Sequence, residues 1–128
     1  MGETHQIIIA ERNPHIREFL RREMTAIGFK VRLVESSEEL LDLIYKRKSV
    51  DLVVLDPDFP CEDATEMLRK ITDRIPRLPV VLHCVRGSND ILYPSGQVIR
   101  IEKDGNSVDM LREAIDTILP HTRHFFRQ

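Results

Sequence analysis

The sequence predicts an α/β fold: a flavodoxin-like, doubly wound, five-stranded parallel sheet in the order 2-1-3-4-5. Five short apolar runs alternate with segments of helical periodicity, as in a chain whose strands are joined by crossover helices. The runs IIIA and LVVL contain no alternating polar residues, which is typical of parallel strands buried on both faces. Right-handed crossovers leave few strand orders, and this order places the first and third strands side by side.

The expected strands share a short apolar core bounded by polar or turn residues. They cover residues 6–10, 30–34, 52–55, 80–84 and 98–101.

The first two expected helices begin at residues that can cap them. The first opens at Asn13, with Pro14 in the first helical position, and ends at Gly28. The second opens at Ser36, and Glu39 three residues later completes a capping box.

Two further helices are expected, from about Asp63 to Arg74 and from near Asn106, with Asp109 as its capping-box partner. Apolar residues at helical spacing predict the face that each helix buries. These residues are Ile16, Phe19, Leu20, Met24 and Ile27 in the first helix, Leu40, Leu41 and Ile44 in the second, Met67, Leu68 and Ile71 in the third, and Met110, Leu111, Ile115 and Leu119 in the last.

The interval between the fourth and fifth strands breaks the pattern. Residues 86–97, RGSNDILYPSGQ, contain two Gly, one Pro and only three adjacent apolar residues. A full amphipathic helix does not fit there. We therefore expect a reduced or missing fourth helix, replaced by a single turn or a loop.

Length and composition predict a single domain over residues 1–128, with a core at about 5–120 and a basic, aromatic tail at 121–128 that we expect to be frayed. A net charge of −2 gives no reason to expect direct nucleic-acid binding. No apolar run approaches the roughly 18 residues of a membrane span. Without a signal peptide or metal-like cysteine spacing, we expect a cytoplasmic protein with free thiols.

Charged residues stand at the ends of three expected strands. Glu11 ends IIIAE, Asp56 ends DLVVLD, and Lys103 follows VIRIE. Open α/β sheets bind ligands at the carboxyl ends of their strands, where the order reverses. We therefore expect these three side chains to form one anionic pocket that contains one cation. The alternatives are a turn-capping Asp56, a solvated Glu11 and a surface Lys103.

Four segments resemble the receiver domain of bacterial two-component response regulators. They are IIIAERNPHIREFL, DLVVLDPDFP, LPVVLHC and IEKDG, in this order, and the resemblance covers roughly residues 5–120. It implies a phosphorelay signalling protein that is not an enzyme, with a histidine kinase or phosphotransfer protein as partner and an unknown downstream protein partner. It also implies that Asp56 is the phosphoacceptor and that Lys103 binds the phosphoryl group.

The resemblance implies Mg²⁺ beside the phosphoacceptor, but several positions depart from the family pattern, two of them directly at the chemistry. Arg12 replaces the second acidic residue of the metal site, and Cys84 stands where the family has Thr or Ser. The remaining metal ligands are then Glu11 and Asp56, with Asp58 as a weak third or as an exposed loop acid. A thiol is also a poorer hydrogen-bond donor than a hydroxyl.

The orientation of Arg12 separates two hypotheses. If the guanidinium points into the pocket, it can hold Asp56 charged without a metal, and Mg²⁺ binding is weak and uncertain. If it points to solvent, the metal site is less disturbed. The chain is then either a phosphoacceptor with weakened Mg²⁺-dependent phosphorylation, or a pseudo-receiver that binds protein partners and is not regulated by phosphorylation.

Other chemical interpretations are weaker. A nucleophilic Cys84–His83 pair is disfavoured because successive strand residues point to opposite faces, so we expect Cys84 to be a small buried residue. No glycine-rich turn follows the first strand, which argues against a dinucleotide site.

Overall fold

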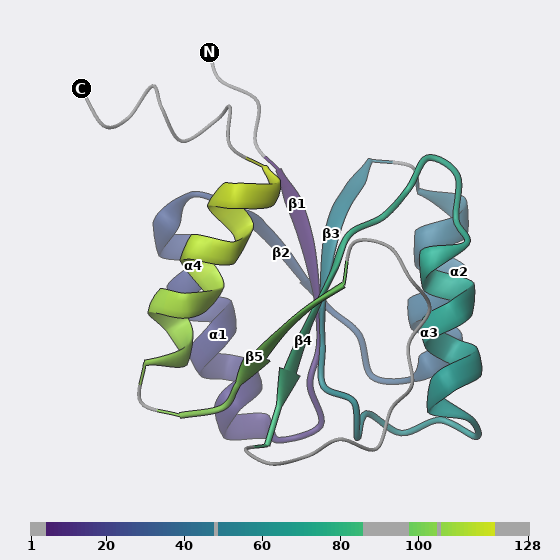
Figure 1. Cartoon of the computed structure of the whole chain (residues 1–128), viewed down its shortest axis with the longest axis horizontal. Coiled ribbons are helices and arrows are strands. Elements are labelled where there is room, and N and C mark those ends of the chain that lie inside the picture. The colour runs from purple at the N-terminus through teal and green to yellow at the C-terminus, as the bar shows by residue number, and fades with distance from the viewer. Residues whose placement is uncertain (1–4, 48, 86–97, 105, 120–128) are drawn as a thin grey trace.

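The computed structural model describes residues 5–47, 49–85, 98–104 and 106–119, and these form a five-stranded parallel sheet (Figure 1). The strand order is β2-β1-β3-β4-β5, which confirms the predicted flavodoxin-like order. The strands are β1 Gln6–Ala10, β2 Lys30–Leu33, β3 Val50–Leu55, β4 Val80–Cys84 and β5 Val98–Glu102.

The strand register aligns the residues that follow β1, β3, β4 and β5 at one edge. Ala10 is paired with Leu55, and the amide of Asp56 donates to the Ala10 carbonyl at 2.8 Å. Cys84 is paired with Glu102, and the amide of Lys103 donates to the Cys84 carbonyl at 2.6 Å. The register thus places the carboxyl ends of these four strands at the same edge of the sheet.

The helices are α1 Pro14–Ile27, α2 Ser37–Lys46, α3 Ala64–Thr72 and α4 Ser107–Ile118. Figure 1, which views the sheet nearly edge-on, shows α1 and α4 on one face and α2 and α3 on the other. This two-sided cover buries both faces of the central strands, which explains their uninterrupted apolar runs.

The predicted caps of the first two helices are present, and the third helix is capped as well. Asn13 Oδ1 accepts hydrogen bonds from the amides of the first turn of α1, and Gly28 ends that helix with a φ of 122°. Ser36 Oγ accepts from the Glu39 amide, and Asp63 caps α3 in the same way. Positive φ strains a residue with a Cβ atom, so glycine suits position 28.

Two predictions about helix ends were wrong. The side chain of Asn106 makes no cap hydrogen bond in α4, and Asp104 Oδ1 instead accepts from the Asn106 amide at 2.8 Å. Asp109 pairs with Arg112 and not with the chain before the helix. Helix α3 ends at Thr72, because the chain turns there and the guanidinium of Arg74 is buried against the Pro76 carbonyl, 2.9 Å from its Nε atom.

Two hydrophobic clusters, one on each face of the sheet, form the core. The predicted stripes are largely confirmed, but Phe19 is 43% exposed and Met110 is 48% exposed. The Arg22 guanidinium lies 5.8 Å from the centre of the Phe19 ring, so the aromatic side chain lies on the surface of α1. Leu43, absent from the predicted stripe of α2, is buried.

Two predictions fall outside the described residues. They are the turn or loop at 86–97 and the tail at 121–128. Within the part of the chain that the structure covers, no helix is long and apolar enough to cross a membrane.

Candidate functional site

Glu11, Asp56 and Lys103 lie together at the carboxyl edge of the sheet. Lys103 Nζ lies 2.9 Å from Glu11 Oε2 and 3.4 Å from Asp56 Oδ2. Both carboxylates are 1% exposed, and the Lys103 side chain is 12% exposed. The structure thus brings the three predicted residues into one buried cluster.

The turn DPDFP orients the Asp56 carboxylate. The amide of Asp58 donates to Asp56 Oδ1 at 2.9 Å, and the amide of Arg12 reaches Asp56 Oδ2 at 3.3 Å. The Asp56 carbonyl accepts from the amide of Phe59, whose side chain is buried and anchors the turn. The carboxylate is therefore held by backbone donors on both oxygens.

Burial and neighbouring charge shift the two buried acids in opposite directions. Burial, and then the nearby Glu11 charge, raise the pKa of Asp56 above its ordinary 3.8, although backbone donors and Lys103 act against this. Burial also raises the pKa of Glu11, but His83, Lys103 and the Asn13 amide outweigh it and bring that pKa below 4.5. The site therefore stabilises the ionised form of Glu11 more than that of Asp56.

Arg12 points toward the pocket. Its Nε atom lies 3.4 Å from Asp56 Oδ2, and its Nη2 atom donates to Asp58 Oδ2 at 3.3 Å. The Arg12 and Asp58 side chains remain about half exposed, so solvent screens much of their attraction. The guanidinium spans the two aspartates of the DPD turn.

The carboxylates in this arrangement do not fit a divalent cation. No three His, Cys, Asp or Glu side chains among the described residues form a group that could hold a metal ion. One oxygen of each carboxylate already faces a cationic nitrogen: Asp56 Oδ2 faces Arg12 and Lys103, Asp58 Oδ2 faces Arg12, and Glu11 Oε2 faces Lys103. A second cation within 4 Å of a guanidinium is strongly repelled.

Cys84 lies beneath the pocket, and its thiol has no hydrogen bond to the residues that the structure describes. Its side chain is fully buried in the cluster under α2 and α3, and burial raises the pKa of its thiol. His83 is buried too, with its Nδ1 atom 3.8 Å from Glu11 Oε1. The thiol shares its hydrophobic cluster with Leu82 and Val80, two and four residues back along β4, so His83 faces the other side of the sheet.

Sequence reasoning missed His83 as a pocket residue. It assigned functional residues to the last positions of strands or to those that follow them, whereas His83 lies one residue before the end of β4. The available signal was a titratable side chain inside an otherwise apolar strand, where a buried polar group needs a partner.

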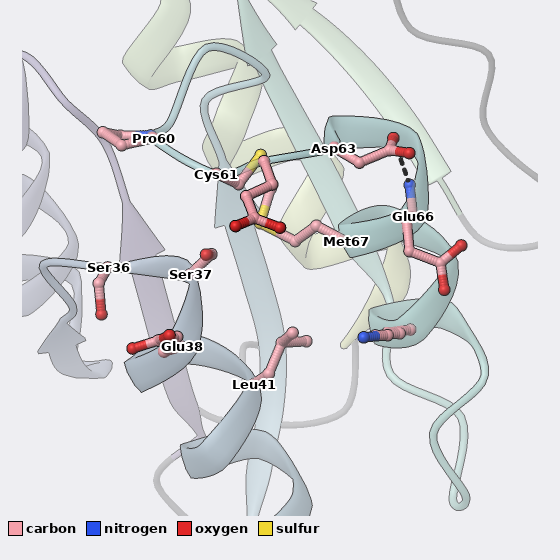
Figure 2. Close-up of a pocket in the computed structure, with 11 residues that line it drawn as sticks. Ser36, Ser37, Glu38, Leu41, Pro60, Cys61, Asp63, Glu66 and Met67 are labelled. Carbon is pink, nitrogen blue, oxygen red and sulfur yellow. Dashed lines mark hydrogen bonds between the residues drawn. The ribbon is translucent and has the colours of Figure 1, made fainter.

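Two concave surfaces lie near this edge. One, of about 410 Å³, is lined by Arg12, Asn13, Ile16, Val85 and Lys103, so two of the residues that contact Asp56 also form its wall. The other, of about 400 Å³, is a groove between α2 and α3, and Figure 2 shows Leu41 and Met67 projecting into it. No predicted site residue lines the second groove.

Comparison with known proteins agrees with this geometry. Residues 7–94 match the family model of the response regulator receiver domain. Response regulator MprA of Mycobacterium sp. (strain KMS) is 32% identical over 83 residues, which are 65% of this chain and 36% of that protein. The chain thus spans about a third of the length of the curated relatives it matches.

Solved structures share the fold. A chain in the crystal structure of histidine kinase ThkA in complex with response regulator TrrA superposes with a TM-score of 0.77 at 24% identity, covering 91% of this chain and 99% of that one. The receiver domain of sensor histidine kinase PA1611 from Pseudomonas aeruginosa PAO1, which has magnesium in its active-site cleft, gives a TM-score of 0.76 at 17% identity, covering 91% of this chain and 98% of that one. With the family match over most of its core, this chain belongs to the response regulator receiver domain family.

Proposed function

We propose that this receiver domain, with its core at about residues 5–120, accepts a phosphoryl group on Asp56 in a phosphorelay and that Arg12 weakens Mg²⁺ binding and thereby the Mg²⁺-dependent phosphorylation. The donor is a histidine kinase or a phosphotransfer protein in the cytoplasm, and the output passes to a protein partner. The observation that carries the proposal is the position of Asp56, buried at the edge of β3 beside Lys103 and beneath Arg12.

The proposed chemistry is a transfer between two nucleophiles. An Asp56 carboxylate oxygen attacks the phosphorus atom, and the bond from phosphorus to the donor imidazole nitrogen breaks, with its electron pair leaving on that nitrogen. Three negative oxygens then lie at the pocket, where Lys103 and Arg12 supply positive charge. Cys84 takes the place of the hydroxyl donor, and we expect it to contribute little.

The position of the Arg12 guanidinium supports the weak Mg²⁺ binding in this proposal. For a cation to bind Glu11, Asp56 and Asp58, the guanidinium must first leave two of these carboxylates. The exposure of the Arg12 side chain keeps that cost modest, because a half-exposed ion pair contributes only about 0–1 kcal/mol. Binding is therefore weakened and not abolished.

Intact-mass measurement tests the proposal. The protein is incubated with acetyl phosphate, with and without Mg²⁺, and the expected result is a gain of one phosphoryl group that Asp56→Asn abolishes. Asp51→Asn is the matched control, because Asp51 lies at the opposite end of β3, where it accepts from the Gln6 amide. A phosphoryl gain that persists in Asp56→Asn would contradict the assignment.

A second function is favoured by one observation. Arg12 lies 3.4 Å from Asp56 Oδ2, and Lys103, which also pairs with Glu11, lies at the same distance, so the Asp56 carboxylate has cationic neighbours without a metal. A pseudo-receiver of this kind would bind protein partners without being phosphorylated. The same measurement separates the two functions, since no phosphoryl gain at any Mg²⁺ concentration would favour the pseudo-receiver.

A further inference from the structure

A buried histidine beneath the pocket has no role in the proposed phosphoryl transfer. The His83 side chain is 2% exposed, and its Nδ1 atom faces Glu11 Oε1 at 3.8 Å. Both ring nitrogens and this carboxylate oxygen lack a hydrogen-bond partner among the described residues. Buried polar atoms are rarely left unpaired, so two of them that face one another point to an interaction between them.

The separation favours a direct hydrogen bond. It exceeds an ordinary N–H···O length by about 0.9 Å, so the proposed hydrogen bond requires the imidazole and the carboxylate to approach by that amount. A bridging water does not suit the gap, because an oxygen at normal distance from both atoms would be sharply bent between them. His83 Nδ1 is therefore well placed to donate to Glu11 Oε1, since both atoms otherwise lack a hydrogen-bond partner among the described residues.

We propose that His83 is a positioning residue whose Nδ1–H donates to Glu11 Oε1 and holds that carboxylate back from a cation at Asp56. Lys103 Nζ and the Asn13 amide, at 2.9 and 3.2 Å, hold the other oxygen, Oε2. Anchors on both oxygens fix the plane of the carboxylate. A glutamate side chain has one more methylene than an aspartate side chain. This extra length lets the Glu11 carboxylate approach His83 of β4.

The lowered pKa of Glu11 agrees with this arrangement. Burial alone raises the pKa of a carboxyl group, and the donors from His83, Lys103 and the Asn13 amide outweigh burial here. Glu11 is then an internal anion of the sheet edge. Because its charge is already paired inside the protein, we expect Glu11 to contribute less as a metal ligand.

The hydrogen bond can be tested in the unmodified protein, independently of phosphorylation. In long-range ¹H–¹⁵N spectra, the His83 ring, assigned by its loss in His83→Asn, is expected to carry its proton on Nδ1. In Glu11→Ala, its Nδ1 resonance is expected to shift, whereas Glu113→Ala, at an exposed position of α4, should leave it unchanged. An unprotonated Nδ1 in the wild-type protein would overturn the proposal.

The consequence for cation binding rests on the proposed function and is measured in an Arg12→Asp background, where the guanidinium no longer competes. We expect Arg12→Asp/His83→Leu to bind Mg²⁺ at least threefold more tightly than Arg12→Asp alone. Arg12→Asp/His83→Asn should match Arg12→Asp, because the asparagine amide nitrogen replaces Nδ1 as the donor. Equal affinities for the leucine and asparagine variants would refute the positioning role.

The competition proposed for Arg12 and the hydrogen bond proposed for His83 can be refuted independently of each other. If Arg12→Asp does not tighten Mg²⁺ binding, the competition proposed for Arg12 is wrong, while the His83 spectrum still decides the hydrogen bond. If the leucine variant does not fold, the wild-type spectrum alone decides. A protonated Nδ1 that responds to Glu11→Ala then supports the inference, and an unprotonated one rejects it.

Discussion

Lys103 is hydrogen-bonded to Glu11 and not to the candidate phosphoacceptor. Its Nζ atom lies 2.9 Å from Glu11 Oε2, whereas the distance to Asp56 Oδ2 is 3.4 Å. The nearest ammonium therefore neutralises Glu11 first, and Asp56 relies on backbone donors and on the half-exposed Arg12. Together with the burial of Asp56 and the contact of His83 with Glu11, this unequal division of one cation explains why the pKa is raised for Asp56 and lowered for Glu11, and it gives the two acids opposite effects on stability.

Glu11→Gln should destabilise the protein at pH 7 by about 2 kcal/mol, somewhat less than for a fully buried pair because Lys103 retains some solvent contact. The pKa of Glu11 is lower in the folded state, so the ionised carboxylate stabilises the fold above pH 4.5. That stabilisation is lost as the pH falls below 4.5 through the folded pKa. The difference in unfolding free energy between wild type and variant, measured in urea, should therefore shrink on acidification.

The control for this prediction is Glu113→Gln, an exposed glutamate of α4 whose loss should change stability little at any pH. A Glu11→Gln penalty that stays constant between pH 7 and pH 3 would show that the charge of Glu11 is not what stabilises the site.

Asp56→Asn should change the stability at pH 7 in the opposite direction to Glu11→Gln. The pKa of Asp56 is raised in the folded state, so the folded protein binds its proton more tightly than the unfolded chain does. Stability contributed by the protonated form is present at low pH and is lost as the pH rises from 3.8 through the folded pKa. At pH 7 the asparagine variant, which carries no charge, is expected to melt at a higher temperature than the wild type.

Below about pH 3.8 the two proteins should melt at the same temperature, because Asp56 is protonated in both the folded and unfolded states. A lower melting temperature of Asp56→Asn at pH 7 would mean that the pairs with Arg12 and Lys103 outweigh the cost of burying the charge.

The sequence was sufficient to predict the sheet and the meeting of Glu11, Asp56 and Lys103. These depend on uninterrupted apolar runs and on a topological rule, and both act over whole elements. The direction of Arg12 was not predictable, because it depends on where the DPD turn places Asp58 relative to the guanidinium. That relationship joins segments more than forty residues apart.

The errors in the predicted core have a similar origin. Periodicity locates the centre of a buried face but not its width, and residues at its edges are decided by neighbouring elements. Met110 lies at such an edge of α4 and is exposed, while Ala114, a weaker hydrophobic signal, is buried. Asn106 was expected to cap α4 by residue type alone, and the preceding Asp104 turn supplies a different arrangement.

The corrected face of α4 can be tested with two truncations. Ile115 is fully buried against β5 and its neighbours, so Ile115→Ala should cost about 2–5 kcal/mol of unfolding free energy. Met110→Ala, on the same helix but about half exposed, should cost about 0.5 kcal/mol or less. Equal losses in chemical denaturation would mean that α4 presents a different face to the sheet.

Arg12→Asp should tighten Mg²⁺ binding at least tenfold, which corresponds to about 1.4 kcal/mol. The substitution removes a guanidinium 3.4 Å from Asp56 and adds a carboxylate where a divalent cation needs one. Without Mg²⁺, the variant should be less stable, because Asp56 and Asp58 lose their shared partner and gain a third negative neighbour. The melting temperature should then rise with added Mg²⁺ much more than in the wild type.

Arg22→Asp makes the same change of charge on the Phe19 side of α1, away from the pocket, and should leave Mg²⁺ affinity close to that of the wild type. Equal tightening by both substitutions would trace the effect to net charge, and no tightening by Arg12→Asp would show that the guanidinium does not compete for the site.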